Sequence, residues 1–222
     1  MKIKIAYLSF PENQFRLNDV HKIRGYLGNL FREHDLFHNH KSDGTLIYRY
    51  PLIQCKVIYG KFYIVAIEKA IEIFSDIFFR TNEIEINDKK IILQSKELKI
   101  KESEFGITKE MKNYMFISPW LALNQENFVK YKNTLNQNER LEILRKCLIG
   151  NILSMCNKTN GLNYEVIQEI KVDFKDIISV STILKGNKLI GFKGYFNINF
   201  EIPELLGIGK ECSRGFGCLK KV

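Results

Sequence analysis

The sequence predicts an α+β fold in which two similar units follow one another, each an antiparallel sheet with helices packed on it. Three observations support this prediction: strand-type alternation near the start of each half, amphipathic helical spacing after it, and later segments rich in Ile, Val, Tyr and Phe. A hydrophobic content of 45% over 222 residues is enough for a substantial core. The chain is therefore long enough for one large domain or two small ones.

The first half begins with a strand over 2–9, where apolar and polar residues alternate. Asn18 or Asp19 can cap a helix over 20–31, whose apolar residues recur at three-to-four spacing. Residues rich in Ile, Val and Tyr then predict two strands. The remaining predicted elements of this half are strands at 45–53 and 56–65, a helix at 67–78 and a strand at 90–100.

The second half repeats this order, with its second helix lost or reduced. A strand is expected over 114–123, although it contains Pro119, and an amphipathic helix over 139–155 has one apolar face. Three β-type segments follow, at 164–174, 177–184 and 189–200.

Two ferredoxin-like units in tandem form the simplest architecture with this order of elements. We expect an N-terminal domain at 1–105 and a C-terminal domain at 106–222. The linker is expected within 102–111, where charged residues and Gly106 interrupt the pattern. The same βαββαβ order builds the RNA-recognition motif. Because 34 Lys and Arg outnumber 25 Asp and Glu, the formal charge is +9, which favours a polyanionic partner.

The cysteines and the N-terminus indicate a reducing, cytoplasmic setting. The five cysteines are odd in number and form no Cys-x-x-Cys pair, which argues against a disulfide framework or a zinc ribbon. The chain begins with strand-type alternation and not with the apolar segment of a signal peptide. Charged residues interrupt the most apolar stretch, 62–79, so we expect no membrane span and no membrane partner.

A glycine-rich motif near the C-terminus is the most distinctive stretch. Residues 207–217 carry two Gly-apolar-Gly groups, separated by five residues that include Lys210 and Arg214. Glycine permits positive φ and close approach to the backbone, so the run suits a loop whose N–H groups face an anion. It matches neither the dinucleotide-binding fingerprint nor the P-loop. The alternative interpretation is a hairpin turn in a C-terminal strand pair.

The four histidines all fall within one short part of the first half, at His21, His34, His38 and His40. In an extended backbone His38 and His40 point to the same side. Two imidazoles on one side suit acid-base cleavage of a phosphodiester, because histidine titrates near neutral pH. Two alternatives remain open: a metal site built from His34, His38 and His40, and solvated loop histidines.

These features together resemble the CRISPR-associated endoribonucleases that cut repeat RNA out of a precursor transcript. The resemblance rests on the tandem ferredoxin-like units, a histidine after the first helix, and the glycine-rich motif at 207–217. The closely placed His38 and His40 are most similar to the members found in type I-B systems.

The resemblance implies cleavage without metal or cofactor. The 2′-hydroxyl upstream of the cut attacks the adjacent phosphorus and leaves a 2′,3′-cyclic phosphate and a 5′-hydroxyl. His38 and His40 would be general acid and base, Tyr48 would position or deprotonate the nucleophile, and Lys41 would stabilise phosphoryl charge. The implied RNA-binding residues are Gly207, Gly209, Lys210, Arg214, Gly215 and Gly217.

The expected partner is CRISPR repeat RNA, with subunits of a CRISPR effector complex and a second copy in a homodimer as further candidates. An alternative function is a non-catalytic subunit that binds repeat RNA and stays with the processed guide. A third is a metal-dependent nuclease built on His34, His38 and His40. For the first function, the histidines and the glycine-rich motif must meet, so the two units must pack side by side.

Overall fold

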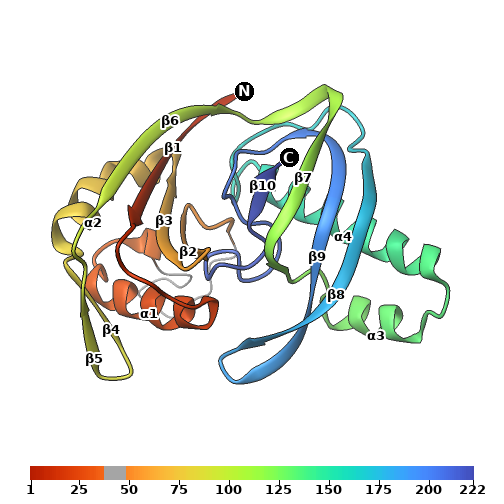
Figure 1. Ribbon diagram of the computed structural model, residues 1–222. Helices are drawn as coiled ribbons and strands as arrows, with labels where there is room; N and C mark the ends of the chain where they lie inside the picture. Colours follow the sequence, from red (N-terminus) through yellow and green to blue (C-terminus); the bar gives the residue numbers. More distant parts are fainter. Residues whose placement is uncertain (38–48) are drawn as a thin grey trace.

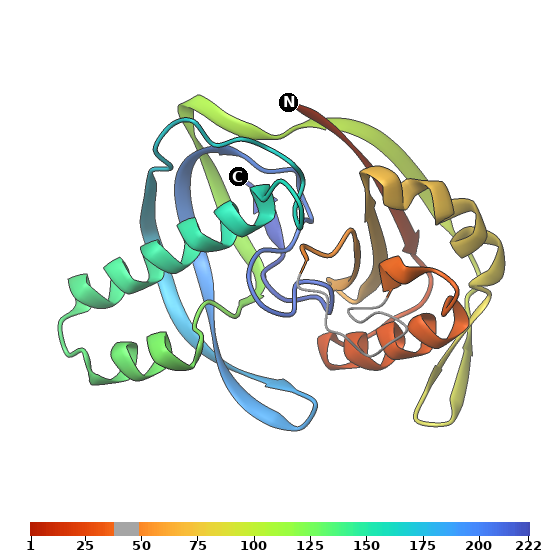
Figure 2. The same ribbon diagram turned by 180° about the vertical axis from the view of Figure 1, so that it is seen from behind.

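The computed structural model describes residues 1–37 and 49–222, which form two units, each an antiparallel sheet with helices packed on it. Figure 1 shows the units side by side, the first in red to yellow-green and the second in green to blue. The segment that carries the glycine-rich motif lies between the two units, both in this view and from behind (Figure 2).

The first unit has a four-stranded sheet in the order β2-β3-β1-β6, and each neighbouring pair is antiparallel. A separate two-stranded hairpin of β4 and β5 follows the second helix. The elements, with 3-10 helices labelled η, are β1 Lys2–Phe10, η1 Leu17–Asp19, α1 Val20–Leu30, η2 Asp35–Phe37, β2 Ile53–Ile58, β3 Lys61–Ile67, η3 Glu68–Ile73, α2 Phe74–Arg80, β4 Glu83–Ile86, β5 Lys89–Ile92 and β6 Glu97–Glu104.

The second unit has a four-stranded sheet in the order β10-β7-β9-β8, again antiparallel throughout. In Figure 2 its longer helix, α4, crosses in front of this sheet, and α3 lies to one side, beside the first part of α4. The elements are β7 Gly106–Trp120, α3 Gln125–Asn133, α4 Gln137–Cys156, β8 Val172–Leu184, β9 Asn187–Glu201 and β10 Leu219–Lys221.

The two sheets have the same topology. When the four strands of each sheet are counted along the chain, both sheets have the order 4-1-3-2, starting from β6 or β10. Together with the helices this is a ferredoxin-like arrangement, so the predicted α+β class with tandem ferredoxin-like units is confirmed. In the second unit residues 202–218, which include the glycine-rich motif, stand between β9 and β10, where the second helix would be.

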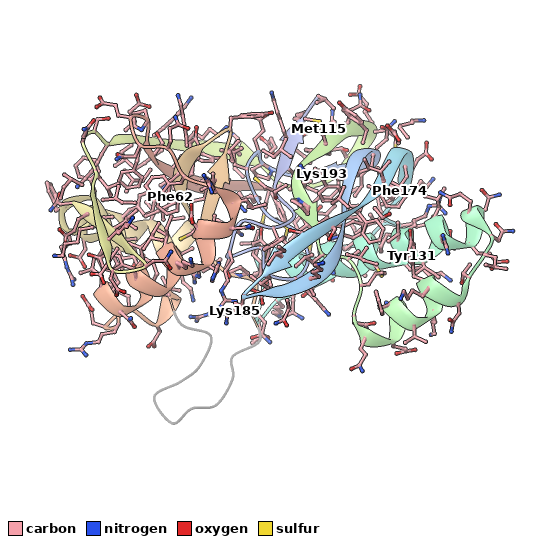
Figure 3. All side chains as sticks on the ribbon, turned by 60° about the horizontal axis from the view of Figure 1, so that its bottom comes forward. Phe62, Met115, Tyr131, Phe174, Lys185 and Lys193 are labelled. Carbon is pink, nitrogen blue, oxygen red and sulfur yellow. The ribbon has the colours of Figure 1, made fainter. Side chains whose placement is uncertain are left out.

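Local sequence explains where several elements begin and turn. Asn136 caps α4, because its side-chain oxygen accepts a 2.8 Å hydrogen bond from the N–H of Asn138. The β8–β9 hairpin turns at Lys185 and Gly186, which both have positive φ, as a type I′ turn requires. Figure 3 shows Lys185 at the tip of this hairpin. The predicted helix over 139–155 is confirmed as α4.

The first strand pair is displaced from its predicted position. The prediction placed strands at 45–53 and 56–65. Of the first, residues 45–48 lie outside the described residues and 49–52 are not strand, so the pair is β2 and β3, which begin at Ile53 and Lys61. The turn between them is at Tyr59 and Gly60, with φ of 50° and 83°. Two consecutive residues with positive φ specify a two-residue hairpin, and this turn sets the register of the pair.

Two other elements of the first unit also differ from the prediction. The helix expected over 67–78 is the 3-10 helix η3 followed by the α-helix α2. The single strand expected over 90–100 is two strands, β5 and β6, separated by residues 93–96. The hairpin of β4 and β5 was not predicted.

Differences also occur in the second unit. The segments expected as separate strands at 164–174 and 177–184 contribute to one strand, β8, which begins only at Val172 and has a register shift between Phe174 and Asp176. The helix α3 was not predicted. None of its residues is buried, so it has no apolar face of the kind that predicts a helix.

All residues of the predicted linker at 102–111 except Phe105 belong to strands. β6 ends at Glu104 and β7 begins at Gly106, well before the start of the strand expected over 114–123. Phe105 joins them, and its ring packs edge-on against Tyr164 and Phe200 at 5.6 and 5.1 Å. The charges that suggested a loop lie on the exposed side chains of β6 and β7.

Buried apolar residues of both units form one continuous core. The glycine-rich segment contributes Ile208 and Cys212 to it, at 1% and 4% exposure. The two units therefore pack side by side, as the predicted function requires. Within residues 1–37 and 49–222 no helix is long and apolar enough to cross a membrane.

Candidate active site at the junction of the two units

A cavity of about 660 Å³ opens where the two units meet. Its walls come from five segments that are distant in sequence. They are Arg49 to Pro51, Leu121 after β7, the second half of α4 with the loop after it, the end of the β8–β9 hairpin, and residues 209–214 of the glycine-rich motif. A concave site between two domains is where ligands most often bind.

The glycine-rich motif is fixed in place by β2 of the first unit. Cys55 donates its N–H to the carbonyl of Ser213 at 3.0 Å, and Cys55 forms a parallel bridge with Arg214. The N–H of Gly207 donates to the side-chain oxygen of Gln54 at 2.9 Å. The motif thus extends the edge of the first sheet, although it belongs to the second unit.

Lys56, also on β2, contacts the motif through its side chain. Its side chain is fully buried, and its Nζ donates to the carbonyl of Cys212 at 3.3 Å. No carboxylate partner of this ammonium is present within residues 1–37 and 49–222. A buried cation is costly unless nearby oxygens solvate it. Lys56 therefore ties the carbonyl of Cys212 to the first unit.

Two glycines of the motif are required by close contacts. At Gly207 a side-chain Cβ would lie 2.7 Å from the Cβ of Cys212 and 2.8 Å from Nζ of Lys56. Gly217 has φ of +60°, and a Cβ there would lie 1.9 Å from the carbonyl oxygen of Ile208. The motif therefore has a structural role in joining the units as well as its predicted role in binding.

Most N–H groups of the motif donate inside the protein. Ile208 and Gly217 donate to Gly217 and Pro119 carbonyls at 3.0 and 2.9 Å, and Arg214 donates to Glu211 at 2.8 Å. The N–H groups of Gly209 and Ser213, which both line the cavity, have no acceptor in the described part of the chain. These two donors are available to an anion in the cavity.

Three cations line the same cavity. Lys210 is exposed, and its Nζ donates to the carbonyl of Leu123 at 3.0 Å. Arg214 forms an ion pair with Glu211, which also lines the cavity. Arg49 donates to the carbonyl of Asp35. Cationic side chains beside free N–H groups suit a phosphate backbone.

Four predicted catalytic residues, His38, His40, Lys41 and Tyr48, lie outside the residues that the structure describes. The described chain resumes at Arg49, which lines the cavity. On the other side of the gap, Phe37 is buried, stacks on Phe31 at 5.2 Å, and accepts a 3.2 Å hydrogen bond from Arg24 at its carbonyl. The six predicted RNA-binding residues are described and lie in the segment between the units.

His34, the remaining member of the alternative metal site, contacts Asp76 at 3.0 Å. Ligand atoms of Glu33, His34 and Asp76 all lie within 4.8 Å of one another. Arg80 donates to both carboxylates of this cluster, so a protein cation already balances their charge. The other two histidines of the alternative lie outside the described residues.

Burial controls the protonation of groups around the motif. All five cysteines are free and buried. Desolvation raises the pKa of Cys212 to about 11, although the nearby cations Lys56 and Arg24 lower it. Desolvation also raises the pKa of Tyr50 well above its usual value, so its phenol stays protonated and donates to the carbonyl of Gly207 at 2.9 Å.

Sequence reasoning missed the polar wall that α4 gives the cavity. Asn151, Ser154 and Asn157 line it, and three-residue spacing places their side chains on one side of the helix end. The run of small polar residues at this spacing is visible in the sequence. It also missed Gln54 and Lys56, whose strand-type pattern gives no sign of distant partners.

Comparison with known protein families and structures shows which proteins the chain is similar to. A family model described as the Cas6b N-terminal domain matches residues 1–104, and one described as the Cas6b C-terminal domain matches residues 106–222. The uncharacterized protein MJ0978 of Methanocaldococcus jannaschii is 44% identical over 124 residues, which are 56% of this chain and 82% of that protein.

Two crystal structures are similar over their full length. One, of Cas6b, is 34% identical with a TM-score of 0.92, and the other, of a CRISPR RNA processing endoribonuclease Cas6b, is 32% identical with a TM-score of 0.78; each covers 100% of both chains. The type IV Cas6 crRNA endonuclease Csf5, at 11% identity and a TM-score of 0.58, shares the fold. The resemblance drawn from the sequence is confirmed, and the chain belongs to the Cas6b family.

Proposed function

We propose that this chain is a metal-independent endoribonuclease that cleaves precursor CRISPR RNA within its repeats. The observation that carries the proposal is the cavity at the junction of the two units. It brings Arg49, the first described residue after the predicted catalytic group, to the same cavity as Lys210 and Arg214 of the glycine-rich motif. A similar solved structure at 32% identity is named a CRISPR RNA processing endoribonuclease.

The described residues supply binding and orientation in this proposal. Lys210 and Arg214 neutralise phosphates of the repeat RNA, and the free N–H groups of Gly209 and Ser213 donate to phosphoryl oxygens. The polar side chains of α4 contact bases or riboses on the opposite wall. Because the motif is fixed to β2, it holds the RNA backbone at a constant position relative to the first unit.

The chemical step uses His38 and His40, which lie outside the described residues. One imidazole of His38 and His40 takes the proton from the 2′-hydroxyl, whose oxygen attacks the adjacent phosphorus. The bond from phosphorus to the 5′-oxygen breaks, and the other imidazole, as imidazolium, protonates that oxygen. Tyr48 orients the 2′-hydroxyl, and Lys41 stabilises the charge on the phosphoryl oxygens. The products are a 2′,3′-cyclic phosphate and a 5′-hydroxyl.

The experiment incubates the chain with end-labelled repeat RNA in excess EDTA and identifies the ends of the products. The account predicts cleavage at one site, with cyclic phosphate and 5′-hydroxyl ends, and no cleavage of RNA with a 2′-deoxy nucleotide upstream of that site. Cleavage that needs a divalent cation would support the alternative nuclease. Binding without cleavage of any repeat RNA would support the non-catalytic subunit.

A further inference from the structure

A second cavity, of about 410 Å³, lies between α3 and α4. Asn151 and Lys210 line both this cavity and the one at the junction of the units, so the two adjoin at these side chains. Figure 2 shows α3 beside the first part of α4 and the glycine-rich segment beside the last part. A polymer bound at the junction can therefore continue between the two helices.

The charges in the second cavity favour an anion. Three lysines line it, Lys130, Lys146 and Lys210, and no carboxylate is among its described lining residues. Lys130 pairs with Glu126, which lies outside the cavity. Lys146 is exposed and has no ion-pair or hydrogen-bond partner in the described ranges. Its ammonium is free to contact a phosphate.

Amide groups in the same cavity are fixed with their donors unused. The side-chain oxygen of Asn151 accepts from the indole N–H of Trp120 at 3.0 Å, and that of Asn124 accepts from the backbone N–H of Asn127 at 2.7 Å. Because indole and backbone N–H groups only donate, both amide oxygens are identified and both NH₂ groups remain. Fixed amide donors of this kind recognise the acceptor groups on base edges.

Gly150 opens the wall of this cavity. It is exposed in the middle of α4, and a Cβ built on it would meet no atom within 4 Å. Packing therefore does not require glycine here, and glycine disfavours a helix interior. A missing side chain allows a ligand to approach the helix backbone closely.

We propose that the cavity between α3 and α4 is a nucleotide subsite for the repeat RNA, which holds a nucleotide that flanks the cleaved one. Lys146 contacts its phosphate, and Asn124 and Asn151 contact its base. The subsite rests on the function proposed above and adds to it a place where the RNA is recognised outside the cleavage cavity.

The experiment measures the affinity of three variants for two RNAs, the full repeat and the shortest RNA that wild-type protein still cleaves. Gly150→Leu fills the open wall, Lys146→Gln removes the free ammonium, and Gly25→Leu is the control. Gly25 is likewise exposed within α1 with no atom within 4 Å of a built Cβ, but it lines neither cavity.

Gly150→Leu is expected to weaken binding of the full repeat about tenfold, the loss of roughly one base contact, and to leave binding of the short RNA unchanged. Lys146→Gln is expected to lower the slope of log K against log salt by about 0.7 for the full repeat only. Gly25→Leu should match wild type with both RNAs.

Wild-type affinity of both cavity variants for the full repeat would overturn the subsite, and so would equal losses with both RNAs. Wild-type protein that binds no repeat RNA would instead overturn the proposed function, and the subsite with it. Thermal unfolding of each variant excludes misfolding as the cause of a loss, and Lys146→Gln tests the subsite on its own because it changes an exposed side chain.

Discussion

The phenol of Tyr50 donates a 2.9 Å hydrogen bond to the carbonyl of Gly207, a residue 157 positions later in the chain. Tyr50 follows Tyr48 by two residues, and Gly207 is the first glycine of the glycine-rich motif. The backbone N–H of Tyr50 also donates to the carbonyl of Asn160, in the loop after α4, at 2.6 Å. Two hydrogen bonds thus join Tyr50, which follows the predicted catalytic segment, to the second unit.

Tyr50→Phe removes only the hydroxyl that donates this hydrogen bond. The buried carbonyl of Gly207 then lacks its donor, so we expect the free energy of unfolding to fall by about 1 to 3 kcal/mol. Urea unfolding measures the loss. The control is Tyr195→Phe, since Tyr195 is 44% exposed and its hydroxyl has no hydrogen bond in the described ranges. Equal stabilities of the two variants would show that the bond between the units contributes nothing.

Gly217→Ala tests the close contact within the motif. The new Cβ would lie 1.9 Å from the carbonyl oxygen of Ile208, so the backbone must move, and we expect a loss of about 3 kcal/mol or more. Gly186→Ala is the matched control, since Gly186 also has positive φ but no atom within 4 Å of a built Cβ. That variant should lose only about 1 kcal/mol. Similar losses in thermal or urea unfolding would contradict the packing of the motif.

Alkaline pH should destabilise the fold through Cys212. Burial raises the pKa of this thiol to about 11, whereas a thiol in the unfolded chain titrates near pH 8.5. The folded state keeps the proton longer, so this contribution to stability is complete below about pH 8.5 and decreases as the pH rises toward 11. The thiol alone accounts for a loss of roughly 2 to 3 kcal/mol by pH 11.

Urea unfolding at pH 8 and pH 10.5, for wild-type protein and Cys212→Ala, measures this loss. The variant should lose less stability over that interval than wild type. Parallel losses would show that other buried groups, such as Tyr50, whose pKa burial also raises, account for the whole effect.

The cations of the cavity should appear in the salt dependence of RNA binding. Arg214→Gln and Lys210→Gln each remove one charge from the cavity wall, so each is expected to reduce the slope of log K against log salt by about 0.7. Lys89→Gln is the control, because Lys89 is an exposed residue of β5, in the hairpin of the first unit, and does not line the cavity. An unchanged slope for both cavity variants would place the RNA elsewhere.

The order of strands and helices could be predicted because it depends on local periodicity. The apolar face of α4 and the alternation of β1 are both visible in short windows, and the ferredoxin-like topology follows from their order. The predicted boundaries were wrong where turn chemistry decided them, as at Tyr59 and Gly60. The helix α3 was missed because none of its residues is fully buried.

The contacts that join the glycine-rich motif to β2 could not be predicted from such short windows of sequence. Cys55 meets Arg214, and Lys56 meets Cys212, across more than half of the chain, and neither pair leaves a local signal. The glycines were recognised as the centre of a functional loop. Their second role, close packing against β2 and Ile208, depends on tertiary contacts that no spacing in the sequence shows.

The central claim is that imidazoles of the first unit act on RNA held by the glycine-rich motif of the second. The most direct test compares cleavage and binding of one repeat RNA, in EDTA, by wild-type protein and the double variant His38→Ala, His40→Ala. The account predicts that the variant binds with an affinity within about twofold of wild type, while its single-turnover cleavage rate falls by about four orders of magnitude or more. A variant that still cleaves within tenfold of the wild-type rate would contradict it.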